Sequence, residues 1–108
     1  MATGFGDMGS LLKQAQEMQR RMQETTQSLS ERVLEGSAGG GVVKAFVSGS
    51  LELKAVKIGK EAVDPEDVET LEDLVAVAVG NALAAAKDLR DREMAKITGG
   101  MSLPGMGF

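Results

Sequence analysis

The chain has 108 residues, no cysteine, no histidine and a formal net charge of -4 at pH 7. This length fits one domain, and the missing residue types exclude disulfides, thiol and imidazole chemistry and the commonest zinc ligands. With three phenylalanines and no tyrosine or tryptophan, small and aliphatic side chains have to form the core.

The charge is unevenly distributed along the chain. Residues 1–60 contain eight Lys/Arg and six Asp/Glu, whereas residues 61–108 contain four and ten. A strongly basic balance, typical of nucleic-acid binding, is absent, so any polyanion has to bind a local patch. No apolar run approaches the ~20 residues of a membrane span and no signal peptide is recognisable, so we expect a cytoplasmic protein without a membrane partner.

A first helix is predicted from about Met8 to Leu29, after a flexible start at residues 1–7. Apolar residues recur there at alternating intervals of four and three, which is the spacing of a coiled-coil seam. The seam comprises Leu11, Ala15, Met18, Met22, Thr25 and Leu29.

Long hydrogen-bond donors occupy the opposite side of this helix. They are Lys13, Gln16, Arg20, Gln23 and Gln27, with Arg21 on one flank. Glu17 is spaced to pair with Lys13 and Arg21, and Glu24 is spaced to pair with Arg20. The pattern is typical of a solvated face with weak ion pairs, and it also offers donors to a phosphate backbone.

A short strand is a candidate at Glu31–Glu35, with Val33 facing inward and Leu34 on the other face. The glycine-rich stretch 36–41 then interrupts the pattern. A turn is favoured over a phosphate cradle, because neither Gly-Lys-Ser/Thr nor GxGxxG spacing accompanies the glycines.

Residues 42–58, VVKAFVSGSLELKAVKI, predict a β-hairpin around Ser48-Gly49-Ser50. The alternation changes phase in its second half, which predicts a bulge near Ala55–Val56. Lysines on this hairpin are expected to face solvent and protect a sheet edge.

Acidic residues are frequent between Glu61 and Asp73, and they fit helix capping better than a divalent-ion site. Asp64 and Pro65 predict a short helix. A second start signal at Thr70 opens a long helix that reaches Ile97.

The long helix is apolar on every side between Leu74 and Ala86, so it is buried on more than one side. At ~42 Å it exceeds an eight-residue strand of ~27 Å and must overhang the sheet. We therefore expect a second copy of the chain to cover part of the overhang. The predicted dimer interface comprises Leu74, Val75, Val77, Ala78, Val79, Ala82 and Leu83.

The last turns of the long helix alternate acids with Lys87, Arg90, Arg92 and Lys96. These cations either complement the helix dipole or reach a phosphate backbone. Residues 99–108 form a glycine-rich apolar tail that is expected to be flexible.

Taken in order, several segments resemble the YbaB/EbfC family of bacterial nucleoid-associated proteins. They are LLKQAQEMQRRMQ (11–23), GGGVVKAFVSG (39–49), VKI (56–58), DPEDVETLEDLVAVAVGNAL (64–83) and the tail GGMSLPGMGF. The resemblance spans nearly the whole chain. It implies one α+β domain of order α-β-β-β-α, in which a small antiparallel sheet is flanked by two long helices, as an intertwined homodimer with DNA-binding arms.

From the resemblance and the residues together, we expect a dimer that grips double-stranded DNA mainly through phosphates, with little sequence specificity. The setting would be the nucleoid, in chromosome organisation, gene regulation or DNA repair. Predicted contacts are Lys13, Arg20, Arg21, Gln16 and Gln23, then Lys87, Arg90 and Arg92. The alternative is an adaptor for recombination, repair or replication proteins. No cofactor, metal or enzymatic activity is expected, because no base is placed to activate a nucleophile.

Overall fold

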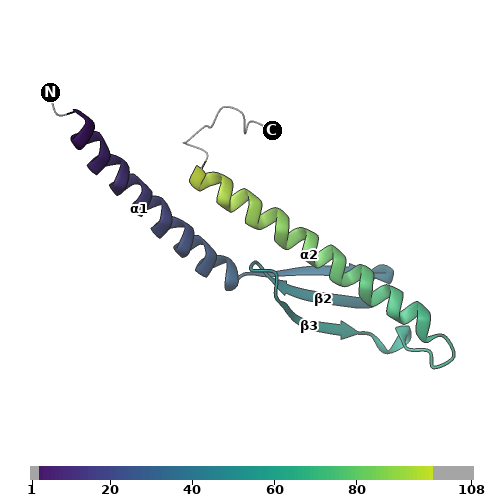
Figure 1. The fold of residues 1–108 in the computed structure, drawn as a ribbon. Helices are drawn as coiled ribbons and strands as arrows, with labels where there is room; N and C mark the ends of the chain where they lie inside the picture. Colours follow the sequence, from purple (N-terminus) through teal and green to yellow (C-terminus); the bar gives the residue numbers. More distant parts are fainter. Residues whose placement is uncertain (1–2, 99–108) are drawn as a thin grey trace, which may run out of the picture.

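The computed structural model of the chain describes residues 3–98, in the predicted order α-β-β-β-α (Figure 1). The elements are α1 (Thr3–Ser30), β1 (Val33–Ala38), β2 (Val43–Ser48), β3 (Leu53–Ile58) and α2 (Val68–Thr98). Two short 3₁₀ turns, Gly39–Gly41 and Lys60–Ala62, follow β1 and β3. Both helices start earlier than predicted, and the predicted tail from residue 99 lies outside the described residues.

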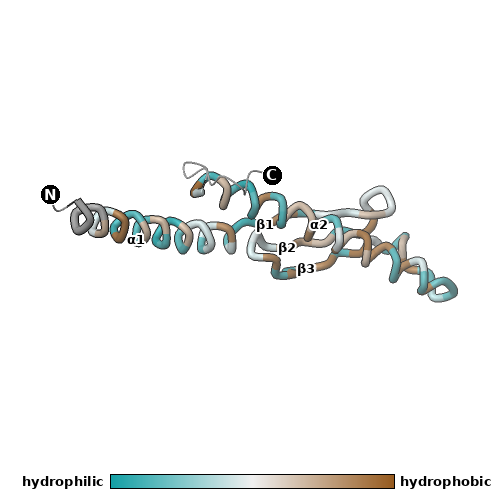
Figure 2. The backbone as a smooth tube through the Cα atoms, turned by 45° about the horizontal axis from the view of Figure 1, so that its top comes forward, coloured by the Kyte–Doolittle hydropathy of each residue, from teal (hydrophilic) through white to brown (hydrophobic). Residues whose placement is uncertain are grey.

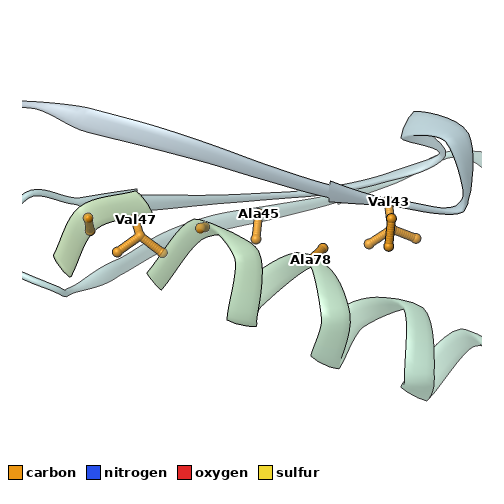
Figure 3. Close-up of a cluster of buried hydrophobic side chains, with 7 residues drawn as sticks. Val43, Ala45, Val47 and Ala78 are labelled. Carbon is orange, nitrogen blue, oxygen red and sulfur yellow. The ribbon is translucent and has the colours of Figure 1, made fainter. Parts of the chain in front are cut away.

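The three strands form one antiparallel sheet of order β1-β2-β3, and α2 packs across one of its faces. Val43, Ala45 and Val47 of β2 point at α2 and are fully buried (Figure 3). The helix meets them with three fully buried alanines, Ala78, Ala82 and Ala86. The core is therefore a thin layer of small side chains between one helix and one sheet.

The closest approach in this layer is between β1 and α2, at Gly36. A Cβ atom at this position would lie 2.3 Å from both the carbonyl oxygen of Ala78 and the backbone nitrogen of Ala82. Strand and helix backbones thus touch directly, and only glycine fits between them. Asn81 Nδ2 donates a hydrogen bond to the carbonyl oxygen of Ser37, 3.1 Å away, and fixes the same strand.

This close approach corrects the predicted first strand. The strand continues to Ala38 instead of ending at Glu35, and Leu34 rather than Val33 faces α2, with Val33 59% exposed. The glycine at position 36 does not break the strand, because α2 requires a residue without a side chain there. The predicted turn is confirmed for Gly39–Gly41, whose three φ angles are positive at 64°, 73° and 99°.

The predicted hairpin and its irregularity are confirmed. Phe46 pairs with Ala55 but Val47 pairs with Leu53, which leaves Lys54 as the extra residue of a bulge, one position before the predicted one. Beyond the bulge, Val56 packs against the core.

The predicted short helix at Asp64–Pro65 is wrong, because these residues form a turn. Asp64 Oδ1 accepts a hydrogen bond from the backbone N–H of Glu66 at 2.9 Å. Asp67 caps α2 instead, accepting bonds from the backbone N–H of Thr70 at 3.3 Å and from its hydroxyl at 2.6 Å. Capping by this acidic segment is thereby confirmed, and no group of three or more potential metal ligands gathers within residues 3–98.

The prediction that two helices flank the sheet is corrected, because only α2 packs on the sheet. Helix α1 leaves the end of the sheet and lies beside the C-terminal half of α2 (Figure 1). Along its seam only Leu29 is buried, and Met18 and Thr25 are half-buried. No element among residues 3–98 covers the second face of the sheet, so this face is open.

The predicted overhang of the long helix is confirmed. Helix α2 has 31 residues, or ~46 Å, whereas each strand has six residues, or ~20 Å. The chain measures 80 × 27 × 16 Å, and its radius of gyration of 21.0 Å exceeds the ~13 Å of a compact chain of this size. Hydrophilic residues line much of the projecting α1, and hydrophobic ones gather where α2 crosses the strands (Figure 2). Within residues 3–98, neither helix combines the length and apolarity that crossing a membrane requires.

The close packing at Gly36 predicts how a substitution there changes the stability of the protein. Gly36→Ala is expected to lower the free energy of unfolding by about 1–3 kcal/mol, because the new methyl group overlaps two backbone atoms of α2. Gly80→Ala is the control: it lies on the exposed side of α2 with nothing within 4 Å, and it should gain up to about 1 kcal/mol. Urea unfolding followed by circular dichroism, at equal protein concentration, measures both. Equal effects of the two substitutions would contradict the close packing of β1 on α2.

Candidate nucleic-acid interface

The predicted contacts of the first helix are all exposed. They belong to α1, which projects from the sheet (Figure 1). This set comprises Lys13, Gln16, Arg20, Arg21 and Gln23. A straight helix holds such side chains at fixed spacing, so a rigid element presents several donors to one ligand. The helix is electrically neutral, however, since its three Lys/Arg are matched by three Asp/Glu.

Both arginines of α1 are engaged by glutamates of the same helix. Arg20 is hydrogen-bonded to Glu17, and its Nη1 donates to Glu24 Oε2 at 2.8 Å. Arg21 Nε lies 3.8 Å from Glu17 Oε2. The hydrogen bond and charge of Glu17, together with Glu24, raise the pKa of Arg20 above its ordinary value. A phosphate therefore competes with these carboxylates for the two guanidinium groups.

Lys13 differs from the arginines, because no carboxylate of residues 8–98 lies within salt-bridge distance of its ammonium group. The predicted Lys13–Glu17 pair is thus not formed, while Glu17–Arg21 and Glu24–Arg20 are. Lys13 also lines an open groove of about 380 Å³ between α1 and the end of α2. The groove is lined by Ser10, Lys13, Gln14, Glu17, Met18, Arg21 and Ile97.

The second predicted set lies on the overhanging part of α2. Lys87 is exposed, Arg92 Nη2 lies 3.0 Å from Asp88 Oδ2, and Arg90 Nη2 lies 3.3 Å from Asp91 Oδ1. One turn on, Lys96 donates a hydrogen bond that lowers the pKa of Glu93. Cations and acids alternate here, so this segment offers less free positive charge than its lysine and arginine content suggests.

The predicted dimer-interface residues divide into three groups by exposure. Ala78 and Ala82 are fully buried under the chain's own sheet and offer no surface. Four are partly buried beside the core: Leu74, Val75, Val79 and Leu83. Val77 is 52% exposed and is the member that presents most surface to a second copy.

The open face of the sheet was not among the predicted contacts. It carries Lys44 and Lys57, which lie directly opposite each other on β2 and β3, and the half-buried Phe46. Alternation along each strand places Lys44 and Phe46 on one face, but the pairing of Lys44 with Lys57 depends on the register, which the bulge shifts. Counting the charge of the hairpin by itself would have drawn attention to it.

Residues 3–98 thus form a small α+β fold with a projecting helical arm that carries hydrogen-bond donors. The sequence matches the YbaB/EbfC DNA-binding family over residues 4–101, and the chain belongs to that family.

Named relatives agree with this assignment. The chain is 50% identical to a nucleoid-associated protein of Moorella thermoacetica over 102 residues, covering 94% of this chain and 98% of the relative. It is 45% identical to a nucleoid-associated protein of Alkaliphilus metalliredigens over 103 residues, covering 95% and 90%. The crystal structure of an uncharacterized Helicobacter pylori protein shares the fold, with a TM-score of 0.72 and 21% identity, over 88% of this chain and 97% of that one.

Releasing the arginines of α1 from their glutamates provides a test of this arm. Glu17→Gln with Glu24→Gln gives α1 a net charge of +2, and DNA is expected to bind more tightly. In a plot of log affinity against log salt, the slope should steepen by up to about 1.8, or 0.9 for each additional phosphate neutralised. Fluorescence anisotropy with a labelled duplex over a salt series measures it.

The matched control is Glu69→Gln with Glu72→Gln, which changes the net charge equally at the other end of the molecule, in the first turns of α2. It should leave the slope nearly unchanged. If the control steepens the slope as much, overall charge and not the α1 arm governs binding.

Proposed function

We propose that two copies of this chain form a homodimer that grips duplex DNA mainly through its phosphates, with little sequence specificity. The arms formed by α1 and the overhanging half of α2 carry the contacts. The observation that supports this most is an exposed, rigid helix with evenly spaced Lys, Arg and Gln side chains, in a chain of a DNA-binding family. The relatives' names support a place in the nucleoid. Chromosome organisation, gene regulation or DNA repair is the setting we propose for it there.

Phosphate contact fits the chemistry of the arm. Lysine, arginine and glutamine donate to phosphate oxygens without reading the base sequence. The chain has no tyrosine or tryptophan on which bases would stack. A dimer would carry a charge of -8, twice that of the chain, so DNA is repelled at long range and attracted only within the ~8 Å over which salt leaves local charges effective. Modest affinity follows, which cooperative loading of many dimers would raise.

Dimerisation fits the apolar surface that the single chain leaves exposed. Val77 of α2 is 52% exposed, and Leu74, Val75, Val79 and Leu83 on the same helix are only partly buried. A second copy would bury this surface and bring four arms into one particle, so that the phosphate contacts of the two copies add.

The second candidate function is an adaptor for recombination, repair or replication proteins. It is favoured by the outer end of α1, where Met8, Leu11 and Leu12 are 66%, 61% and 61% exposed. An apolar strip on a projecting helix is a common docking element for another protein. DNA binding that is absent at low salt, or insensitive to salt, would favour the adaptor.

Removing the cations of α1 tests the DNA-binding arm. Lys13→Ala, Arg20→Ala and Arg21→Ala together are expected to weaken duplex binding and to reduce the steepness of the salt slope by up to about 2.7 per chain. A gel-shift series from low to physiological salt measures it. Lys13→Arg with Arg20→Lys and Arg21→Lys is the control, because it keeps the charge and should keep the slope. An unchanged slope in the alanine variant would remove α1 from the interface.

A separate substitution tests the dimer. Val77→Asp is expected to shift the assembly toward single subunits, because it places a charge on a surface that the second copy covers. Since Val77 is 52% exposed in the single chain, the fold itself should tolerate it. Val68→Asp is the matched control, with the same 52% exposure at the first residue of α2 and outside the predicted interface. Sedimentation equilibrium measures the mass of each variant, and equal masses for both would place the interface elsewhere.

A further inference from the structure

Two lysines face each other on the open side of the sheet. The register pairs Lys44 of β2 with Lys57 of β3. Their neighbours along β2, Val43 and Ala45, point at α2 and are fully buried, so the lysines lie on the side away from α2. Like charges at directly opposed positions of an antiparallel pair repel each other and destabilise the sheet.

Neighbouring groups do not neutralise this pair. Lys44 Nζ lies 3.9 Å from Glu35 Oε2 on β1, at the limit of an ion pair between exposed groups. Lys57 Nζ lies 5.8 Å from the centroid of the Phe46 ring and has no carboxylate within salt-bridge distance among the described residues. Two cations and one loosely held carboxylate leave an excess of positive charge.

Protection of a sheet edge does not account for the arrangement. Lysines on edge strands discourage pairing with other chains, and Lys57 on β3 fits that role. Lys44, however, lies on the central strand, whose two edges are already paired. A sheet that needed only edge protection would be more stable with a neutral residue at position 44.

The segment from β2 to the first residue of the turn after β3 is also the most positive part of an acidic chain. Residues 43–60 contain four lysines and one glutamate, a net charge of +3, whereas the chain has -4. By the same count α1 is neutral and α2 has -2. Because long-range repulsion has to be overcome locally, this segment attracts a polyanion more strongly than the net charge of either helix does.

A shallow groove beside the two lysines has room for a phosphate group. It measures about 360 Å³ and is lined by Gly40, Gly41, Val42, Lys44, Lys57, Ile58, Gly59 and Glu61. The glycines expose backbone, and a Cβ atom on Gly40 or Gly41 would have nothing within 4 Å. Glu61 is the one acid of the groove, and it lies beside Gly59. Two lysines against one carboxylate still favour an anion.

We infer that Lys44 and Lys57 bind phosphodiester groups of DNA, so that the open face of the sheet is a contact surface in addition to the helical arms. This inference rests on the proposed DNA binding and adds a site to it. The repulsion between the two lysines is relieved when a phosphate lies between them, so the sheet is strained when free and relaxed when bound. The site binds a phosphate whatever the base sequence of the DNA, in keeping with weak specificity.

Lys44→Gln with Lys57→Gln tests the site, because glutamine keeps most of the length of the side chain and removes the charge. The salt slope is expected to fall in steepness by about 0.9 per chain, because the phosphate held between the two lysines is no longer neutralised. The urea midpoint of unfolding is expected to rise, because the repulsion is gone. This opposite movement of binding and stability distinguishes removal of a phosphate ligand from damage to the fold, and a lower midpoint would overturn the inference.

The matched control is Lys54→Gln with Lys60→Gln, which removes the other two lysines of residues 43–60 and changes the net charge equally. Lys54 is held by Glu52 at 2.5 Å, and Lys60 lies in the turn after β3. The slope should change less than in the Lys44/Lys57 variant, and an equal change would overturn the assignment to this pair. Glu61→Gln should tighten binding, and weaker binding would count against the groove.

The remaining outcomes separate the inference from the proposed function. If the unaltered chain binds duplex and the Lys44/Lys57 variant binds with the same affinity and slope, the sheet site is wrong and the helical arms stand. If the unaltered chain binds no duplex at low salt, the proposed function itself fails. If the variant changes the sedimenting mass, the open face is an interface between copies and not a DNA site.

Discussion

The whole structure depends on the direct packing of two backbones, where β1 lies against α2 at Gly36. This packing requires small residues on both sides, and the chain supplies a glycine in the strand and alanines in the helix. Bulky side chains are not needed to fill the layer between them, which explains how a chain with three phenylalanines builds a core at all. Because the sheet is short, this core holds only part of α2, and the remainder of the helix is left to project.

The projecting arm is firmly attached at its base. Two residues join α1 to β1, and their backbone N–H groups bond to the last turn of the helix, Glu31 to Ser28 at 3.1 Å and Arg32 to Leu29 at 3.0 Å. The carbonyl oxygen of Arg32 in turn accepts a hydrogen bond from the backbone N–H of Gly49, at the hairpin tip, at 2.9 Å. Leu29 is buried nearby. The direction of α1 is therefore set where it leaves the sheet, while its outer half is free of the core. On the half nearer the sheet, Arg20 and Arg21 share Glu17, and Arg20 also pairs with Glu24, so an anion has to compete with these carboxylates for the two arginines.

Periodicity in the sequence was sufficient to predict both helices, the hairpin with its bulge, and the overhang of α2, because these depend on spacing within one segment. Prediction from periodicity failed where contact with another segment determines the local structure. Val33 and Leu34 are equally apolar, and only the position of α2 determines which of them faces inward. Gly36 suggests a local break, yet it is required by the helix it touches. The spacing of the residues around Glu17 does not indicate that Glu17 forms an ion pair with Arg20, three residues later, and not with Lys13.

The extended outline of the molecule affects how it moves in solution. A body of 80 × 27 × 16 Å meets more friction than a sphere of the same mass, so it diffuses and tumbles more slowly. One subunit of 11.3 kDa would travel through a porous gel like a considerably heavier globular protein. Migration of this protein therefore reports the length of its helices as much as the number of its copies.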